Sequence, residues 1–545
     1  MRRLRPRRME VGPFRLVRNL LRTAPRELWL VYLLKVLDSY GYFALSEVFT
    51  LLLTDEFGVD DVTAGAYYGA WGTAITLYGI FTGCLIDAMG VRTSLVASYA
   101  LQTASRVVLV GTRSRALALT MLFLVQPLGS SWGAPVLTIA IKRLTANADR
   151  TVSFGIFYAM MNVAALVSGI AIDALRLGLP GGLSPGDPTS VLASPIRVVV
   201  ASTVISSIVA VAVSSRFREL PPHGGGRGEH EHPVVSSFAS PASYVLATYY
   251  RPAAALMRSR RFWQFLAMAL FTLNLKQIFR HMDATFPKYA LRAFGCDAPF
   301  GSIYAINPAL IVLGVPVVAA LTPNVRHFDM IFRGSWITAL SPFTLALSQT
   351  YAGACAFVVL LSIGEAIWSP RWYDFTMACA PVGKEGVFGA LALMPLFVAK
   401  LPVGVLGGYL LHTYCPGREG GDCPAGGGSD DTGGGAAAGR LACDGRAMWG
   451  TIGLITLTSP VLIAIFHPLL RGAEDTDSAR GGGGSSYAYE ELDAPVVVAE
   501  MVEMTPERGE IEMRRGCGAV EDDDDAAEIE LIAPEGTLVS DQGRE

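Results

Sequence analysis

The sequence predicts an all-helical membrane protein with twelve transmembrane helices in two pseudo-symmetric six-helix bundles. Of the 545 residues, 51% are hydrophobic and 17% are charged, whereas soluble globular chains carry about 25% charged residues. The charges gather at both ends and in one central stretch. The apolar runs between them approach or exceed the roughly 20 residues that cross a bilayer as a helix. A polar connector separates the runs into two sets of six.

The apolar runs define the expected helices in chain order. We expect the first six spans at 28–53, 64–87, 93–112, 116–141, 151–174 and 196–215. We expect the second six at 262–290, 300–322, 328–347, 353–379, 386–412 and 446–469. The fourth run is uncharged throughout, whereas the ninth contains Arg333 and is separated from the tenth only by the polar stretch at 348–350.

The charges between the spans predict the orientation in the membrane. Residues 1–27 contain nine Arg against two Glu, a net charge of +7. Lys142, Arg143 and the seven Arg of the 216–261 loop fall on the same side of the predicted topology. Because cytosolic loops carry the excess of Lys and Arg, twelve spans place both termini in the cytosol. The first loop on the other side is purely acidic, with Asp55, Glu56, Asp60 and Asp61.

Five segments follow from this layout. We expect a basic cytosolic N-terminus at 1–27, a first bundle at 28–215, a cytosolic linker at 216–260, a second bundle at 261–470 and a disordered acidic cytosolic tail at 471–545. The tail holds 21 Asp and Glu against six Arg, a composition that favours disorder. Its segment 489–492, Tyr-Glu-Glu-Leu, has the form of a tyrosine sorting signal, which predicts a cytosolic sorting partner unless the match is due to chance.

The cysteines and histidines predict no metal site and no cofactor. Cys415, Cys423 and Cys443 lie in the 414–445 loop, where we expect one disulfide if the compartment is oxidising. The other five Cys lack metal-ligand spacing, and the histidines at 230 and 232 lie in a linker without fixed geometry. The sequence also lacks a phosphate-binding glycine loop and a nucleophile elbow, so we expect neither an enzyme nor a nucleic-acid partner.

Polar side chains inside the spans carry the functional prediction. Ionisable groups are costly in hydrocarbon and indicate a cavity or a pathway. Helical spacing gives four polar stripes: Lys35, Asp38 and Tyr42; Tyr158 and Asn162; Lys276, Arg280 and Asp283; Glu365, Ser369 and Trp372. One interpretation places the stripes around a central cavity near the midplane. In the alternative, Lys35–Asp38 and Lys276–Asp283 are structural ion pairs.

The segment between spans two and three carries the most specific motif, Gly83-Cys-Leu-Ile-Asp87-Ala-Met-Gly90-Val-Arg92. It resembles the Gly-x-x-x-Asp-x-x-Gly-x-Arg loop of the major facilitator superfamily. The resemblance implies the two six-helix bundles of that superfamily. It also implies a gating role for Gly83, Asp87, Gly90 and Arg92, because in the family this loop latches the two halves together.

Three further segments resemble the proton-dependent oligopeptide (peptide and nitrate) transporters of that superfamily. They begin at Asp38, Phe157 and Gly364, and read Asp-Ser-Tyr-Gly-Tyr-Phe-Ala-Leu, Phe-Tyr-Ala-Met-Met-Asn and Gly-Glu-Ala-Ile-Trp-Ser-Pro. The resemblance implies that Tyr42, Asn162 and Glu365 face the substrate, with the glutamate toward a substrate amino group. The chain departs from the family in span one, where Glu-x-x-Glu-Arg is replaced by Lys35-x-x-Asp38-Ser39, and in span four, where Ala134 replaces Lys.

We therefore expect a secondary transporter that moves a small charged or zwitterionic solute, such as a peptide, amino acid or organic anion, by alternating access with proton coupling. The expected substrate-binding residues are Tyr42, Tyr158, Asn162, Lys276, Arg280, Glu365, Ser369 and Trp372. The expected proton-coupling residues are Lys35, Asp38 and Asp283. The alternatives are an uncoupled facilitator and a non-transporting receptor or scaffold that signals through the tail. We expect the protein to lie in the plasma membrane or in an organelle membrane, in contact with membrane lipid.

Overall fold

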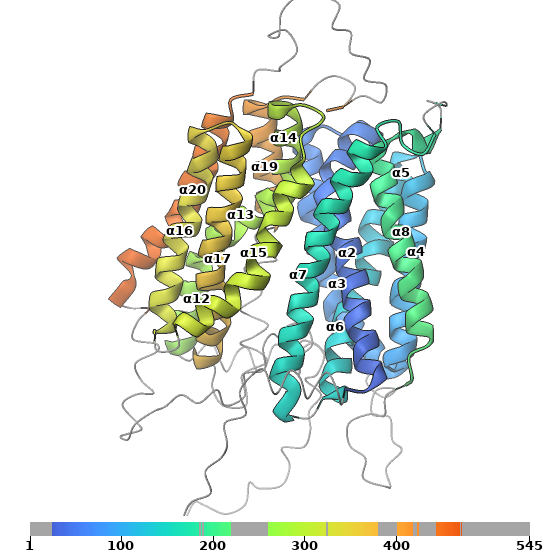
Figure 1. Cartoon of the computed structure of the whole chain (residues 1–545), viewed down its shortest axis with the longest axis horizontal. Helices are drawn as coiled ribbons and strands as arrows, with labels where there is room; N and C mark the ends of the chain where they lie inside the picture. The colour runs from blue at the N-terminus through green and yellow to red at the C-terminus, as the bar shows by residue number, and fades with distance from the viewer. Residues whose placement is uncertain are drawn as a thin grey trace, which may run out of the picture. The chain divides into compact units, whose positions relative to one another are not determined.

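The computed structural model describes residues 24–145, 147–184, 187, 190–219, 260–322, 325–379, 400–417, 422–423, 443–468 and 470. Within these ranges every regular element is a helix (Figure 1). The predicted basic N-terminus up to residue 23, most of the predicted linker and the predicted acidic tail lie outside the described residues, as does the sorting motif at 489–492.

The N-terminal half comprises the helices up to residue 215. They are α2 (Arg26–Leu51) with the π-helix η1 (Leu52–Glu56), α3 (Asp61–Met89), α4 (Val91–Gly111), α5 (Arg115–Thr120) with the π-helix η2 (Met121–Val125), α6 (Gln126–Leu144), α7 (Asn147–Gly178), the short 3-10 helix η3 (Val191–Ala193) and α8 (Pro195–Ser215). A helix therefore lies at each of the first six predicted spans. The fourth is assembled from α5, η2 and α6.

The C-terminal half comprises α12 (Arg260–Phe271), α13 (Leu273–Ala284), α14 (Phe286–Phe294), α15 (Phe300–Leu321), α16 (His327–Leu347), α17 (Tyr351–Cys379), α19 (Lys400–Tyr414) and α20 (Gly445–Ile465). The predicted seventh span is divided into α12, α13 and α14. Pro287 explains the second division, because its missing N–H and its ring interrupt a continuing helix. Residues 386–399 of the eleventh span lie outside the described residues.

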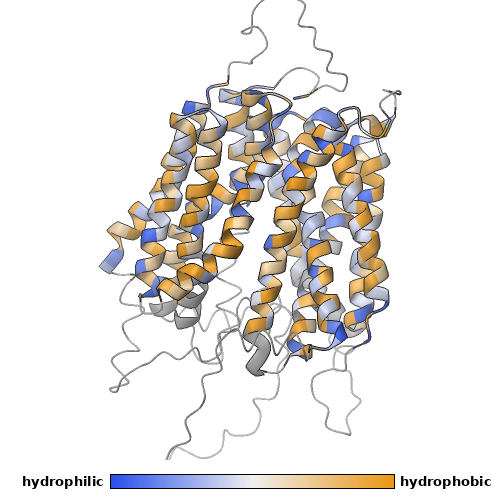
Figure 2. Ribbon diagram, in the orientation of Figure 1, coloured by the Kyte–Doolittle hydropathy of each residue, from blue (hydrophilic) through white to orange (hydrophobic). Residues whose placement is uncertain are grey.

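Seven helices in the described part of the chain are long and apolar enough to cross a membrane: Arg26–Glu56, Arg115–Leu144, Val152–Gly178, Pro195–Ser215, Phe300–Leu321, Tyr351–Trp372 and Gly445–Ile465. Hydrophobic residues predominate along the helices (Figure 2). Large apolar side chains are exposed, including Leu124, Ile205, Leu313, Leu321, Leu347 and Ile465. Apolar surface of this kind is expected where helices face lipid rather than water.

The two halves pack most extensively through two pairs of helices, α3 with α19 and α7 with α15, and α2 also contacts α13 and α14. Figure 1 shows α7 beside α15. Glycines allow both approaches: a Cβ on Gly65 would lie 2.1 Å from the carbonyl oxygen of Gly404, and one on Gly169 would lie 2.3 Å from that of Gly301. Small residues at membrane-helix interfaces permit such close backbone contact.

Gly65→Ala and Gly169→Ala are each expected to destabilise the contact between the halves. The added methyl group has no space, and overpacking of this kind costs about 1–3 kcal/mol. Thermal unfolding of the purified protein in detergent measures the effect as a lowered Tm. Gly79→Ala in α3 and Gly155→Ala in α7 are matched controls, because a Cβ at either position meets no atom within 4 Å. Equal Tm values for test and control variants would show that the close approach is unimportant.

Candidate functional site

A cavity of about 190 Å³ lies between the two halves. Its wall is formed by α2 and α7 from the N-terminal half and by α13, α15 and α17 from the C-terminal half. Eight of the residues singled out from the sequence line it: Tyr158, Asn162, Lys276, Arg280, Asp283, Glu365, Ser369 and Trp372. The helical spacing on the fifth, seventh and tenth predicted spans therefore identifies three faces that share one void.

Asp283 is a buried carboxylate of the cavity wall with partners on two helices. It is 2% exposed, and its Oδ2 lies 2.9 Å from Nη1 of Arg280 on the next turn of α13. The hydroxyl of Tyr68 on α3 donates a hydrogen bond to the same oxygen at 3.1 Å. The ion pair at this point is therefore Arg280–Asp283, which the sequence interpretation did not single out. Asp283 also connects the C-terminal half to α3 of the N-terminal half.

Lys276 brings a second cation to the cavity wall. Its Nζ lies 4.3 Å from the centroid of the Trp372 ring, and the lysine is 5% exposed. A cation over an aromatic face is stabilised by the ring quadrupole, more strongly when both are withdrawn from water. The cavity therefore has two cationic groups on α13, one turn apart.

Glu365 on α17 supplies an acidic group to the same cavity. Asn307 on α15 donates a hydrogen bond from Nδ2 to Glu365 Oε2 at 2.8 Å and lies 3.1 Å from the Ser362 hydroxyl. These contacts orient the carboxyl group at the wall. Cations and carboxyl groups thus line one void, an arrangement that complements a solute carrying both charges.

The N-terminal half contributes neutral groups to the cavity. Asn162 donates a hydrogen bond from Nδ2 to the backbone carbonyl of Tyr158 at 3.0 Å, and Phe43 and Met161 add apolar surface. The acidic and basic lining residues Lys276, Arg280, Asp283 and Glu365 all belong to the C-terminal half. The chemistry of the cavity is therefore asymmetric.

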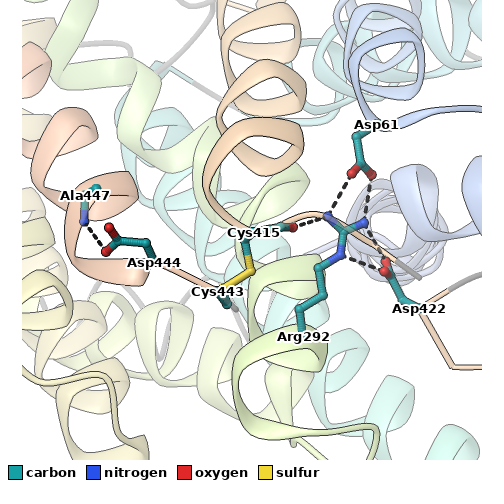
Figure 3. Close-up of a disulfide and its surroundings, with 7 residues drawn as sticks. All are labelled: Asp61, Arg292, Cys415, Asp422, Cys443, Asp444 and Ala447. Carbon is teal, nitrogen blue, oxygen red and sulfur yellow. Dashed lines mark hydrogen bonds and ion pairs between the residues drawn. A yellow bond between two sulfur atoms is a disulfide. The ribbon is translucent and has the colours of Figure 1, made fainter. Parts of the chain in front are cut away.

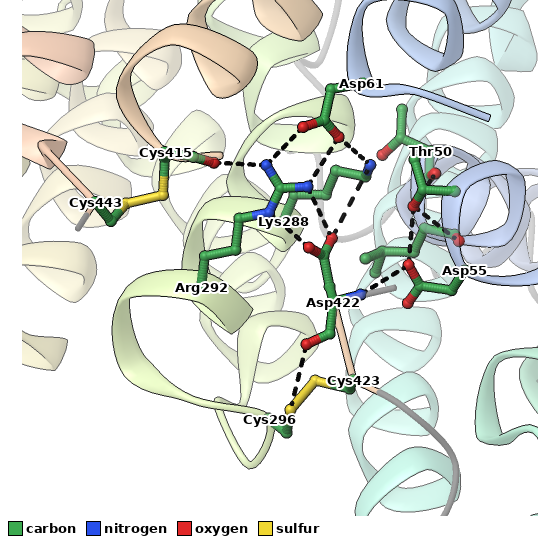
Figure 4. Close-up of polar contacts among 12 residues, drawn as sticks. Thr50, Asp55, Asp61, Lys288, Arg292, Cys296, Cys415, Asp422, Cys423 and Cys443 are labelled. Carbon is green, nitrogen blue, oxygen red and sulfur yellow. Dashed lines mark hydrogen bonds and ion pairs between the residues drawn. A yellow bond between two sulfur atoms is a disulfide. The ribbon is translucent and has the colours of Figure 1, made fainter. Parts of the chain in front are cut away.

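A second cluster of charges joins the halves at the end of α3 that begins with Asp61 (Figure 4). The guanidinium of Arg292 on α14 binds both carboxylate oxygens of Asp61, each at 2.8 Å. Lys288 Nζ lies 2.6 Å from Asp61 Oδ1. We call Asp61, Lys288, Arg292 and Asp422 the charge cluster. Bidentate arginine–carboxylate contacts are among the stronger ionic interactions in proteins, so this cluster holds the halves together at this end.

Two disulfides lie beside the charge cluster, Cys415–Cys443 and Cys296–Cys423 (Figure 3 shows the first). The first falls within the loop where the sequence predicts one. The second uses Cys296, which the sequence does not group with the others. Asp422 precedes Cys423, and its carboxylate binds Arg292 Nε at 2.6 Å and Nη2 at 3.1 Å.

A third contact between the halves involves α7 and the start of α15. Asp173 accepts hydrogen bonds from the backbone N–H groups of Gly301 at 3.2 Å and Ser302 at 2.6 Å. Its carboxylate therefore caps the N-terminus of α15, where unpaired N–H groups favour an anion. Arg176 donates to the carbonyls of Cys296 and Ala298. Two sets of polar contacts therefore join the halves at this end: the charge cluster, and the contacts of Asp173 and Arg176 with the start of α15.

The family model of the Major Facilitator Superfamily matches residues 29–398. The chain belongs to the Major Facilitator Superfamily. It is accordingly a multi-pass integral membrane protein and a membrane solute transporter, as the loop motif predicts. Among curated proteins, none matches the sequence.

Solved structures of transporters of the POT family share the fold of this superfamily member. One, in complex with a thioalcohol conjugated peptide, has a TM-score of 0.60 at 15% identity, over 82% of this chain and 97% of that chain. Another, in complex with 5-aminolevulinic acid, gives the same values. A third comes from work on substrate recognition in proton dependent oligopeptide transporters. It has a TM-score of 0.60 at 14% identity, over 82% of this chain and 99% of that chain.

The superfamily loop of the transporter contacts the end of α8. Gly90 has a φ of +77°, and the backbone N–H groups of Val91 and Arg92 donate to the Glu219 carboxylate at 2.7 and 3.0 Å. Arg92 Nη2 donates to the Ser215 carbonyl at 2.7 Å. A side chain at position 90 would be strained by the positive φ and would meet the Glu219 carboxylate. These contacts all lie within or next to the N-terminal half. The surroundings of Gly83 and the side chain of Asp87 lie outside the described part of the chain.

Three predicted site residues of the transporter lie away from the cavity wall. Lys35 Nζ lies 4.7 Å from the Phe157 ring centroid. Asp38 accepts a hydrogen bond from Gln102 at 3.3 Å. Tyr42 stacks on Trp71 and binds Lys400 Nζ at 3.2 Å. These three residues of the span-one stripe are not among those that line this cavity, and their roles in binding and coupling stay predictions. Lys35, Asp38 and Tyr42 contact α3, α4, α7 and α19.

Arg106 on α4 is a buried cation that the sequence interpretation missed. It is 1% exposed, and its Nη2 donates to Gln102 Oε1 at 2.9 Å. Gln102 in turn binds Asp38, so a guanidinium from α4 reaches the span-one carboxylate through one amide. Gly41 makes room, since a Cβ there would lie 2.5 Å from Arg106 Nη1. The sequence signal was an arginine inside the third predicted span.

Proposed function

We propose that the chain is a secondary transporter for a small zwitterionic or anionic, peptide-like solute, working by alternating access. The observation that carries the proposal is the cavity between the halves, lined by Lys276 and Arg280 together with Glu365 and Asp283. A solute with an amino group and a carboxylate complements such a wall. The POT-family structures in complex with a conjugated peptide and with 5-aminolevulinic acid support the same solute class.

We further propose that twelve spans form two six-helix bundles, 28–215 and 261–470. The seven helices of sufficient length and apolarity support seven of the spans. We assign the others to α3, α4, α12–α14, α16 and α19. Even parity then places both termini in the cytosol, and the end with the disulfides faces outward. The membrane is the plasma membrane or that of an organelle whose lumen is oxidising, because disulfides persist only in an oxidising compartment.

Asp283 is the proposed proton-coupling residue. Protonation would weaken its contact with Arg280 and Tyr68, so that the guanidinium becomes available to a solute carboxylate. Lys35 and Asp38 are weaker candidates for this role, because they lie off the cavity wall. We propose substrate contacts for the lining residues Tyr158, Asn162, Lys276, Arg280, Glu365, Ser369 and Trp372. We propose the same role for Tyr42, which binds Lys400 on α19.

Reconstituted vesicles test the proposal. They are offered peptides, amino acids, nitrate, organic anions and neutral sugars, with and without an acid-outside pH gradient. The proposal expects uptake of zwitterionic or anionic solutes and accumulation only with the gradient. Uptake indifferent to the gradient would identify an uncoupled facilitator, and transport of neutral sugars alone would refute the charged-cavity interpretation. Deletion of residues 471–545 tests the receptor alternative, because a carrier retains uptake without its tail.

Lys276→Gln and Glu365→Gln are expected to change charge preference in opposite directions. A hydrogen bond to a charged group contributes about 1.5–3 kcal/mol, which is roughly a 10- to 100-fold rise in KM. Lys276→Gln should raise KM for solutes with a carboxylate, and Glu365→Gln for solutes with an amino group. Competition by matched pairs of free and blocked amino acids measures both. Arg333→Gln, at an exposed position of α16, is the control, and equal effects of both variants on both solutes would contradict the assignment.

A further inference from the structure

Arg292 has two carboxylate partners of different origin. Asp61 belongs to the N-terminal half, whereas Asp422 belongs to the loop between α19 and α20 of the C-terminal half. Lys288 shares this arrangement, with Asp61 Oδ1 at 2.6 Å and Asp422 Oδ2 at 4.0 Å. All four side chains are buried, at 1% to 8% exposure. One anion of the charge cluster therefore comes from the opposite half, and the other from the same half as the two cations.

In alternating access the two halves separate at this end, so the two anions of the charge cluster behave differently. When the outward end opens, Asp61 must leave Lys288 and Arg292. Removing a counter-ion from a buried cation is strongly unfavourable. Two cations left without an anion would therefore resist the separation, and the closed conformation would be held too tightly.

The Cys296–Cys423 disulfide keeps Asp422 with the cations. Cys296 follows α14, which carries Lys288 and Arg292, and Cys423 is the neighbour of Asp422. The four cysteines of both disulfides belong to the C-terminal half, so neither bond ties the halves together. The Asp422 backbone N–H also donates to Asp55 Oδ1 of the N-terminal half at 3.1 Å, a contact that is lost on opening together with that of Asp61.

We propose that Asp422 is a tethered counter-ion of the outward gate, which the Cys296–Cys423 disulfide holds beside Arg292 and Lys288 in both the closed and the open conformation. The inference rests on the proposed alternating-access function. Asp422 is a positioning residue: it touches no solute, and it competes with Asp61 for the same cations. Without its charge, Asp61 attracts both cations more strongly, and the gate opens less often.

Distances between the halves test this role independently of transport. Spin labels on non-natural amino acids replace Arg115 at the start of α5 and Arg446 in α20, both at exposed positions. Pulsed spin-resonance distances in lipid nanodiscs then give the population that is open at this end. Asp61→Asn provides the open reference. Asp422→Asn is expected to reduce the open population about tenfold, Asp422→Glu to retain it, and the double variant Cys296→Ser/Cys423→Ser to resemble Asp422→Asn.

A mutant cycle separates the gate role from a general structural role. In the Asp61→Asn background, Asp422→Asn should change the open population less than about twofold, because no anion of the opposite half remains to compete. Asp297→Asn, an exposed carboxylate beside Cys296, is the control. An unchanged or larger open population in Asp422→Asn alone overturns the inference. If the wild type shows no uptake but its gate still opens and closes, the proposed transport function is refuted. The distances then still decide whether Asp422 controls the gate.

Discussion

Asp283→Asn is expected to abolish accumulation of solute against a gradient and to lower the initial uptake rate at least about 100-fold. The side chain is 2% exposed and binds Arg280 at 2.9 Å and Tyr68 at 3.1 Å. Removing one member of a buried ion pair costs about 3–5 kcal/mol, and each 1.4 kcal/mol is a factor of ten. The amide can accept the Tyr68 hydrogen bond but can neither neutralise Arg280 nor exchange a proton.

Two further variants separate coupling from folding in this experiment. Asp283→Glu keeps the charge and should retain measurable coupled uptake. Asp283→Asn alone leaves Arg280 as an unpaired buried charge and should lower the Tm. The double variant Arg280→Gln/Asp283→Asn removes both charges, so its Tm should be closer to that of the wild type, while coupled accumulation stays absent. Uptake with and without an acid-outside gradient is measured on vesicles containing equal amounts of folded protein. Accumulation by Asp283→Asn at the wild-type level would exclude the proposed coupling residue.

Arg292→Gln is expected to be comparably damaging, through the gate. The guanidinium binds Asp61, Asp422 and the Cys415 carbonyl. Its removal leaves the Asp61 and Asp422 carboxylates close together with Lys288 as their remaining cation in the charge cluster. Like charges in a buried site repel strongly. We therefore expect the outward end to stay open and solute uptake to fall about 100-fold.

The same label pair at positions 115 and 446 measures the position of the gate in this variant. Arg292→Lys should restore closure only in part, because an ammonium cannot form the bidentate contact of a guanidinium. Arg333→Gln, an exposed arginine of α16, is the matched control. A closed gate and wild-type uptake in Arg292→Gln would show that the charge cluster is dispensable for alternating access.

Much of the helical framework could be predicted from local sequence, because a long apolar run satisfies its backbone hydrogen bonds internally. The break of the seventh span at Thr285 was harder to place, although Pro287 signals it. The break matters for function: Lys276, Arg280 and Asp283 on α13 face the cavity, whereas Lys288 and Arg292 on α14 join the charge cluster.

The partners of individual charges could not be predicted in the same way. Helical spacing placed Lys276 and Asp283 on one face, but the ion pair forms between Arg280 and Asp283. Lys35 and Asp38 share a face of α2 that turns toward Phe157 and Gln102. Periodicity defines which residues share a face of one helix. It contains no information on which neighbour that face meets.

The sequence by itself determined the membrane class, the superfamily and three polar helix faces, since apolar length, a loop motif and helical periodicity are properties of contiguous residues. Only the tertiary structure decided that these faces share a cavity, that Arg106 reaches Asp38 through Gln102, and that Cys296 pairs with Cys423 across 127 residues. Such contacts depend on how helices far apart in the chain pack, and the close approaches at Gly65 and Gly169 set that packing.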